Sequence, residues 1–225
     1  LGVLLKHAPA AVVAPATELC TAILGKTMTD NFPDVKKLSC THVATLSKLV
    51  GEAVTPFVPN LVKGTMACLK HQQAKIRIAG LQALAALVPH NMDQALFHDL
   101  LLPLRSLTAD RSHTVREELM TVAAYWLGEL GEGEARWLLP VLLTGVADET
   151  PGVREVALAA IGRAGERLLA GSSGVEAPAE RPPPTALPVG FASGAIARPS
   201  AGARALTAHH LSELIPPIVS ELGEW

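Results

Sequence analysis

The sequence has 225 residues, a formal net charge of −2 from 19 basic and 21 acidic residues, and an apolar fraction of 49% with only 4% aromatic residues. This charge balance argues against a nucleic-acid-binding protein, which usually carries a basic stripe. No apolar run is long enough to span a membrane. The first residues lack the basic leader and apolar core of a signal peptide, and they are typical of the end of a helix, so we expect a fragment of a longer array.

Three cysteines, Cys20, Cys40 and Cys68, lie within apolar helical patterns. An odd and sparse set of cysteines does not form a disulfide framework. Buried free thiols fit a reducing compartment. The sequence therefore predicts a cytoplasmic protein with reduced, buried cysteines.

Four similar segments recur at residues 30–36, 71–77, 110–116 and 148–154. Each ends in a β-branched aliphatic residue followed by a cation. The aliphatic residues are Val35, Ile76, Val115 and Val153, so their spacings are 41, 39 and 38 residues. A period near 40 with two helical patterns per unit is typical of HEAT or armadillo arrays. The pattern predicts an all-α, right-handed α-solenoid of HEAT-type helical hairpins.

The predicted units follow one another over residues 15–50, 55–88, 94–130 and 135–169, after the end of an earlier unit, so that residues 1–170 form the array. In the third unit, apolar residues at helical spacing predict two inward faces. The first comprises Leu96, Leu100, Leu101, Leu104 and Leu107, and the second comprises Val115, Leu119, Val122, Ala123, Trp126 and Leu127. Pro33 and Pro151 suit the first turn of a second helix, whereas Pro103 and Pro140 fall inside first helices and are expected to kink them.

Residues 171–203 differ from the rest of the chain, because 23 of these 33 residues are Gly, Ala, Pro or Ser. Such a segment has little apolar surface with which to offset the entropy of ordering its backbone. We expect a flexible insertion, either a spacer or a functional loop. The pattern of residues 206–225 predicts the first helix of a fifth unit, in which Pro216 follows the aliphatic Ile215.

The recurring cations Lys36, Arg77, Arg116 and Arg154 would line up along the array, and Trp137 would lie near the start of a first helix. One interpretation is a basic stripe that binds an acidic protein, with the tryptophan as an anchor. The other is an ion-pair ladder between repeats, in which the acid of one unit lies beside the cation of the next, because Asp30, Asp110 and Asp148 recur with the cations. His71 replaces the acid in the second unit.

No motif in the sequence indicates catalysis, a metal or a cofactor. Residues 25–27 resemble the end of a phosphate-binding loop, but Cys20 stands where the motif needs its first glycine. The adjacent pair His209 and His210 would point apart on a helix, and zinc-binding spacings are absent. We therefore expect a protein that is not an enzyme and has no small-molecule substrate.

The order of these motifs resembles the HEAT-repeat family of dynein axonemal assembly factors. The resemblance rests on residues 33–36 with Cys40, 71–77, Val115 and Arg116 with Trp126, 139–154, the insertion with Arg181 and Pro182, and 214–216 with Trp225. The alanine-rich insertion departs from the family in composition.

This resemblance implies a non-catalytic cytoplasmic scaffold, acting near or within cilia and flagella. Its implied partners are axonemal dynein chains, other dynein assembly factors and chaperones. The family supplies no catalytic residues to carry over. A second hypothesis is a scaffold of the transport-receptor or phosphatase type, because such solenoids share the repeat.

Overall fold

The computed structural model describes residues 1–90, 94–130, 132–171 and 199–223. Within these ranges the regular structure is entirely helical. The second helices of the units are α4 (Pro33–Val50), α6 (Ala74–Leu87), α8 (His113–Glu129) and α10 (Pro151–Gly171). The first helices are α3 (Thr17–Thr27), α5 (Val58–Leu69), α7 (Gln94–Thr108) and α9 (Glu132–Val146). The all-α solenoid predicted from the sequence is confirmed.

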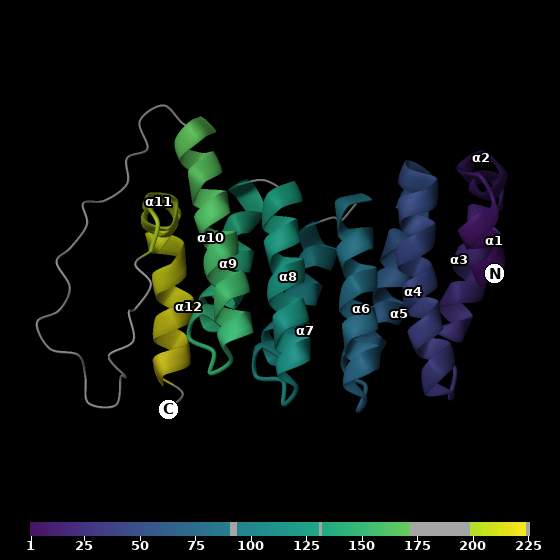
Figure 1. Cartoon of the computed structure of the whole chain (residues 1–225), viewed down its shortest axis with the longest axis horizontal. Coiled ribbons are helices and arrows are strands. Elements are labelled where there is room, and N and C mark those ends of the chain that lie inside the picture. Colours follow the sequence, from purple (N-terminus) through teal and green to yellow (C-terminus); the bar gives the residue numbers. More distant parts are fainter. Residues whose placement is uncertain (91–93, 131, 172–198, 224–225) are drawn as a thin grey trace, which may run out of the picture.

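Each helix packs against its counterpart in the next unit, which produces two layers. The second helices contact one another in the order α4, α6, α8, α10, and the first helices in the order α3, α5, α7, α9. Figure 1 shows the hairpins side by side along the long axis of the molecule. Before α3 and α4, the short helices α1 (Gly2–His7) and α2 (Ala10–Val13) pack against α4. Short 3-10 segments, η1 (Ala14–Ala16), η2 (Gly51–Phe57) and η3 (Val88–His90), join the helices.

The core lies between the two layers and follows the predicted helical periodicity. All of the inward positions predicted for the third unit are buried, and Val115 and Trp126 have no exposed surface. The Phe97 and Trp126 rings form an edge-to-face pair with centroids 6.3 Å apart. Cys20, Cys40 and Cys68 are free and buried. Contact with the Cys68 thiol, together with burial, raises the pKa of Cys40, which keeps this thiol protonated.

Proline positions agree with the sequence prediction. Pro33 and Pro151 are the first residues of α4 and α10, where a missing N–H is tolerated, and Pro103 and Pro140 lie inside α7 and α9. Gly51 follows the last residue of α4 as its C-cap, with a φ of 57° that is readily adopted only by a residue without a side chain.

The C-terminal segment differs from the single helix expected over residues 206–225. It forms two helices, α11 (Ala201–His209) and α12 (Leu211–Gly223), separated at His210. Helix α11 lies on α10, whereas α12 lies on α9. In Figure 1, α11 is seen nearly end-on beside α10, while α12 runs along the other helices. One straight helix could not make both contacts, and the buried His210, 3.0 Å from a Glu213 carboxylate oxygen, lies where the chain changes direction.

The expected insertion over residues 171–203 also has different limits. Residues 172–198 lie outside the described part of the chain, but Gly171 still belongs to α10 and α11 begins at Ala201. The Ser200 side chain accepts a hydrogen bond from the Ala203 amide and caps α11. Gly165 and Gly202 place the backbones of α10 and α11 in direct contact, because a Cβ at Gly165 would overlap the Gly202 carbonyl.

Replacement of Val115 tests the register of the repeats. Val115→Asp buries an unpaired carboxylate at a position with no exposed surface, so we expect a loss of about 3 kcal/mol or more in the free energy of unfolding. Thr121→Asp, on the exposed side of the same helix, is the control and should change stability by less than about 1 kcal/mol. Urea unfolding followed by circular dichroism measures both. Equal stability of the two variants would show that the assigned inward face is wrong.

Candidate protein-binding surface

The four repeated turns share one hydrogen bond. In each turn, the side chain of the first residue accepts from the amide two residues later, which is the geometry of an Asx turn. Asp110 accepts from the Ser112 amide at 2.9 Å, and Asp148 accepts from the Thr150 amide at 2.8 Å. In the second unit, His71 does the same through Nδ1, 3.1 Å from the Gln73 nitrogen. A histidine thus preserves the turn although it removes the acid.

Two buried ion pairs join successive repeats. Arg77 donates to an Asp110 carboxylate oxygen at 2.6 Å, and both side chains are less than a tenth exposed. Arg116 contacts both Asp148 oxygens, at 2.6 and 3.0 Å, in a bidentate pair. Each cation therefore meets the acid of the following unit, the reverse of the order predicted from the sequence. The contact with Asp148 raises the pKa of Arg116.

Each of these arginines also binds the backbone of its own turn. Arg77 donates to the carbonyls of His71 and Gln72 at 2.7 and 2.9 Å, and Arg116 donates to the Asp110 carbonyl at 2.6 Å. The fork of a guanidinium can bind both groups at once. One side chain thus closes its own turn and holds the next repeat.

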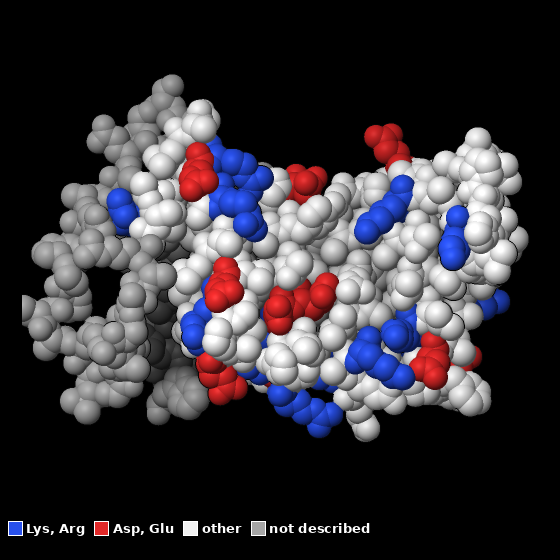
Figure 2. Space-filling model, viewed as in Figure 1, with Lys and Arg blue, Asp and Glu red and all other residues white. Residues whose placement is uncertain are grey.

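The four cations expected to form a binding stripe consequently have different environments. Arg77 and Arg116 are buried in their ion pairs, which favours the ladder as their role. Arg154 donates to the carbonyls of its own turn, Asp148 and Glu149, at 2.8 Å each. Lys36 of the first unit is half-buried, and the turn of the second unit carries His71 in place of the acid. On the face shown in Figure 2, the described charged side chains form small separate groups, and a continuous basic stripe is not visible there.

Trp137 lies in the layer of first helices, away from the ladder. It is half-buried in α9, its ring is 5.7 Å from that of His98 in α7, and the Arg136 guanidinium lies 4.9 Å from its centroid. Although it contacts these two groups, Trp137 is only half-buried. Its remaining exposure keeps it a candidate contact for a partner.

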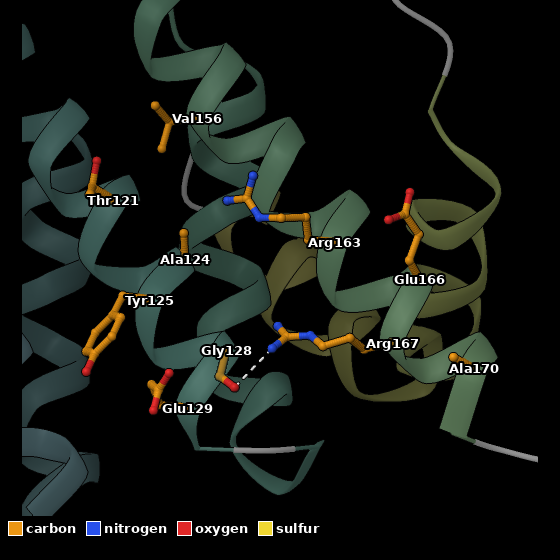
Figure 3. A pocket seen from close by; sticks show the side chains of 10 residues that line it. All are labelled: Thr121, Ala124, Tyr125, Gly128, Glu129, Val156, Arg163, Glu166, Arg167 and Ala170. Atoms are coloured by element: carbon orange, nitrogen blue, oxygen red, sulfur yellow. Dashed lines mark hydrogen bonds between the residues drawn. The ribbon is translucent and has the colours of Figure 1, made fainter.

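A groove lies between α8 and α10. It has a volume of about 660 Å³ and is lined by one stripe from each helix: Thr121, Ala124, Tyr125, Gly128 and Glu129 of α8, and Val156, Arg163, Glu166, Arg167 and Ala170 of α10. Figure 3 shows Arg163 and Arg167 directed from α10 toward α8, while Glu166 points away from them. Tyr125 and Glu129 form the opposite wall.

The two arginines in this groove do different things. Arg167 donates to the carbonyls of Gly128 and Leu127 at 3.0 and 3.3 Å. These carbonyls belong to the last turn of α8, where helix carbonyls lack intrahelical partners. Arg163, one turn earlier, is exposed. Arg167 therefore connects the repeats, while the Arg163 guanidinium faces solvent.

Tyr125 is the aromatic residue of the groove. Its side chain is 46% exposed, unlike the neighbouring Trp126, which is fully buried. Burial and the nearby Glu129 carboxylate raise the pKa of Tyr125, so its hydroxyl remains a hydrogen-bond donor at neutral pH. Tyr125, Arg163 and Arg167 were not predicted from the sequence as site residues. Tyr125 is the only tyrosine in the chain and directly precedes Trp126. This was the only feature of the sequence that could have indicated it.

Within the described ranges, no group of three or more His, Cys, Asp or Glu side chains could hold a metal ion. No described helix is both long enough and apolar enough to cross a membrane.

Removal of one arginine tests the ladder. Arg116→Ala leaves the buried Asp148 carboxylate without its partner, so we expect a loss of about 3–5 kcal/mol in the free energy of unfolding. Lys75→Ala is the matched control, because the Lys75–Asp34 ion pair between units is 50% and 80% exposed; its loss should be below about 1 kcal/mol. Urea unfolding measures both. Similar small losses would contradict a structural role for the buried pair.

The same pair predicts a dependence on pH. Arg116 holds the pKa of Asp148 below its ordinary value, so the stabilisation is complete above about pH 4 and is lost as the pH falls through the lower folded value. Thermal unfolding measured at decreasing pH should therefore show a steeper fall in Tm for the natural chain than for Asp148→Asn. Parallel curves would exclude Asp148 as a source of acid sensitivity.

Comparison with known proteins gave one family. Residues 4–170 match the family model described as "Dynein axonemal assembly factor 5-like, TPR repeats". The spacings of 38–41 residues in this chain are longer than the 34 residues of a tetratricopeptide unit and fit a HEAT unit. No solved structure matches the chain.

Curated relatives agree with the family model. The chain is 28% identical over 218 residues to dynein axonemal assembly factor 5 of Xenopus laevis, and 24% identical over 218 residues to that of Homo sapiens. These matches cover 95% and 96% of the chain but only 25% of each relative. A third match, from Drosophila melanogaster, is 31% identical over 140 residues, 60% of the chain and 16% of the relative. With a family model that covers most of its array, the chain belongs to the dynein axonemal assembly factor 5-like family of helical-repeat proteins.

Proposed function

We propose that this chain is part of a non-catalytic cytoplasmic scaffold for the pre-assembly of axonemal dynein arms, which drive cilia and flagella. The observation that carries the proposal is the family match over residues 4–170. Its partners would be dynein chains together with other assembly factors or chaperones. The curated relatives are named for dynein assembly, and the chain spans a quarter of their length.

The architecture supports a binding role. Stacked hairpins present a long surface on which a large client can make many contacts. The α8–α10 groove and the half-buried Trp137 lie in different helix layers, so both layers offer side chains to partners. We propose that these contacts, with Lys36 and Arg154, contribute to binding, while Arg77 and Arg116 act by holding the repeats together.

Recovery of dynein chains tests the proposal. The tagged chain, expressed in ciliating cells, should co-precipitate axonemal dynein heavy or intermediate chains from the cytoplasmic fraction. The Val115→Asp variant tests whether recovery requires the folded array. It should recover at most about a tenth as much dynein, because the buried charge disrupts the packing of the hairpins. Recovery of a nuclear-transport GTPase or a phosphatase catalytic subunit without dynein chains would instead favour the other classes of solenoid scaffold.

A further inference from the structure

The groove between α8 and α10 contains a cation that the fold does not use. Arg163 and Arg167 lie one turn apart on α10 and both point toward α8 (Figure 3). Arg167 is engaged with two carbonyls of the preceding unit. Arg163 is exposed, and no hydrogen bond or ion pair joins it to another described residue. Its guanidinium therefore has five donors available to a partner.

Apart from its charged and polar residues and Tyr125, the groove is lined by small or apolar residues. These are Ala124 and Gly128 of α8 and Val156 and Ala170 of α10. The stripe from Thr121 to Glu129 runs over nine residues, so its ends are eight rises of 1.5 Å, or about 12 Å, apart along the helix. An extended chain rises about 3.3 Å per residue, so the groove has room for about four residues of an extended segment.

The opposite wall supplies an aromatic face and a hydrogen-bond donor. Tyr125 exposes 46% of its surface on the groove side of α8. Its hydroxyl can donate to a backbone carbonyl of a bound segment. Glu129 lies on the α8 wall, and Glu166 lies on α10 with its side chain directed away from the two arginines (Figure 3). These carboxylates would repel a polyanion such as a nucleic acid. The charges thus suit one isolated carboxylate beside apolar groups.

We propose that the α8–α10 groove binds an extended segment of a client protein, with an aspartate or glutamate on Arg163 and an adjacent apolar side chain between Tyr125 and Val156. A bidentate arginine–carboxylate contact beside apolar side chains provides both orientation and affinity. The nature of the client rests on the proposed function, whereas the chemistry of the segment rests on the groove alone.

Fluorescence anisotropy of a labelled short peptide tests that chemistry without any dynein chain. The probe carries a single aspartate flanked by leucines, and its matched control replaces that aspartate with lysine. The 225-residue chain should bind the aspartate probe and not the lysine one. Arg163→Glu should weaken binding of the aspartate probe by about tenfold or more, because it removes the charge-assisted contact and adds repulsion. Lys63→Glu, the same charge change at an exposed position on α5, should leave affinity unchanged.

Equal binding of the two probes, or an Arg163→Glu variant that binds as well as the natural chain, would overturn the groove proposal. Tyr125→Ala provides a second variant and should weaken the same probe. Circular dichroism should show both variants folded, since Arg163 and Tyr125 are exposed.

A second measurement tests whether the groove takes part in the binding of dynein chains. The co-precipitation described above is repeated with Arg163→Glu and Lys63→Glu. Loss of dynein chains with Arg163→Glu alone supports the groove as the client site. Undiminished recovery with Arg163→Glu would remove the groove from client binding and leave the proposed function standing. Failure of the natural chain to recover dynein, with the peptide result intact, would overturn the proposed function and not the groove.

Discussion

The stacking of the repeats depends on the contacts of a buried arginine at the start of a second helix. Arg116 is bound at the same time to the carbonyl of its own turn and to the carboxylate of the next turn. Burying a guanidinium is costly unless its donors are paired. The alternative arrangements of neighbouring hairpins would leave this group unpaired. The arginine therefore contributes chiefly to the register between repeats, and apolar packing between the layers supplies most of the net stability.

The junction between the first and second units shows what replaces this contact. His71 keeps the turn through its ring nitrogen but offers no carboxylate to Lys36. The two units are joined instead by the exposed Lys75–Asp34 pair and by the buried Ser47 hydroxyl, which donates to the Ala86 carbonyl at 2.9 Å. The Ser47 hydrogen bond is neutral and does not titrate. The titrating group of this junction is Asp34, whose pKa Lys75 lowers, but the pair is exposed and solvent screens it, so it contributes less to stability than the buried pairs.

The sequence was sufficient to predict the period, the helices and the inward faces, because each unit repeats the same apolar pattern and the same turn. It also indicated that the recurring acids and cations pair. The direction of pairing was wrong, because it depends on which neighbouring turn the guanidinium reaches, and this is a tertiary distance. The break at His210 was not predicted, because it accompanies tertiary contacts, of α11 with α10 and of α12 with α9, that no local pattern indicates. The groove was missed for the same reason, since its walls come from different repeats.

The position of the groove follows from the way the third and fourth units are joined. At one end of the seam, Arg116 in the first turn of α8 binds Asp148; toward the other end, Arg167 binds the final carbonyls of α8. Both contacts hold α8 and α10 at a set separation, and the small side chains of Ala124 and Gly128 leave the space between them open. A groove whose walls are fixed before binding loses little conformational entropy when a segment enters. The contacts that stack the repeats therefore also preorganise the surface on which Arg163 remains available.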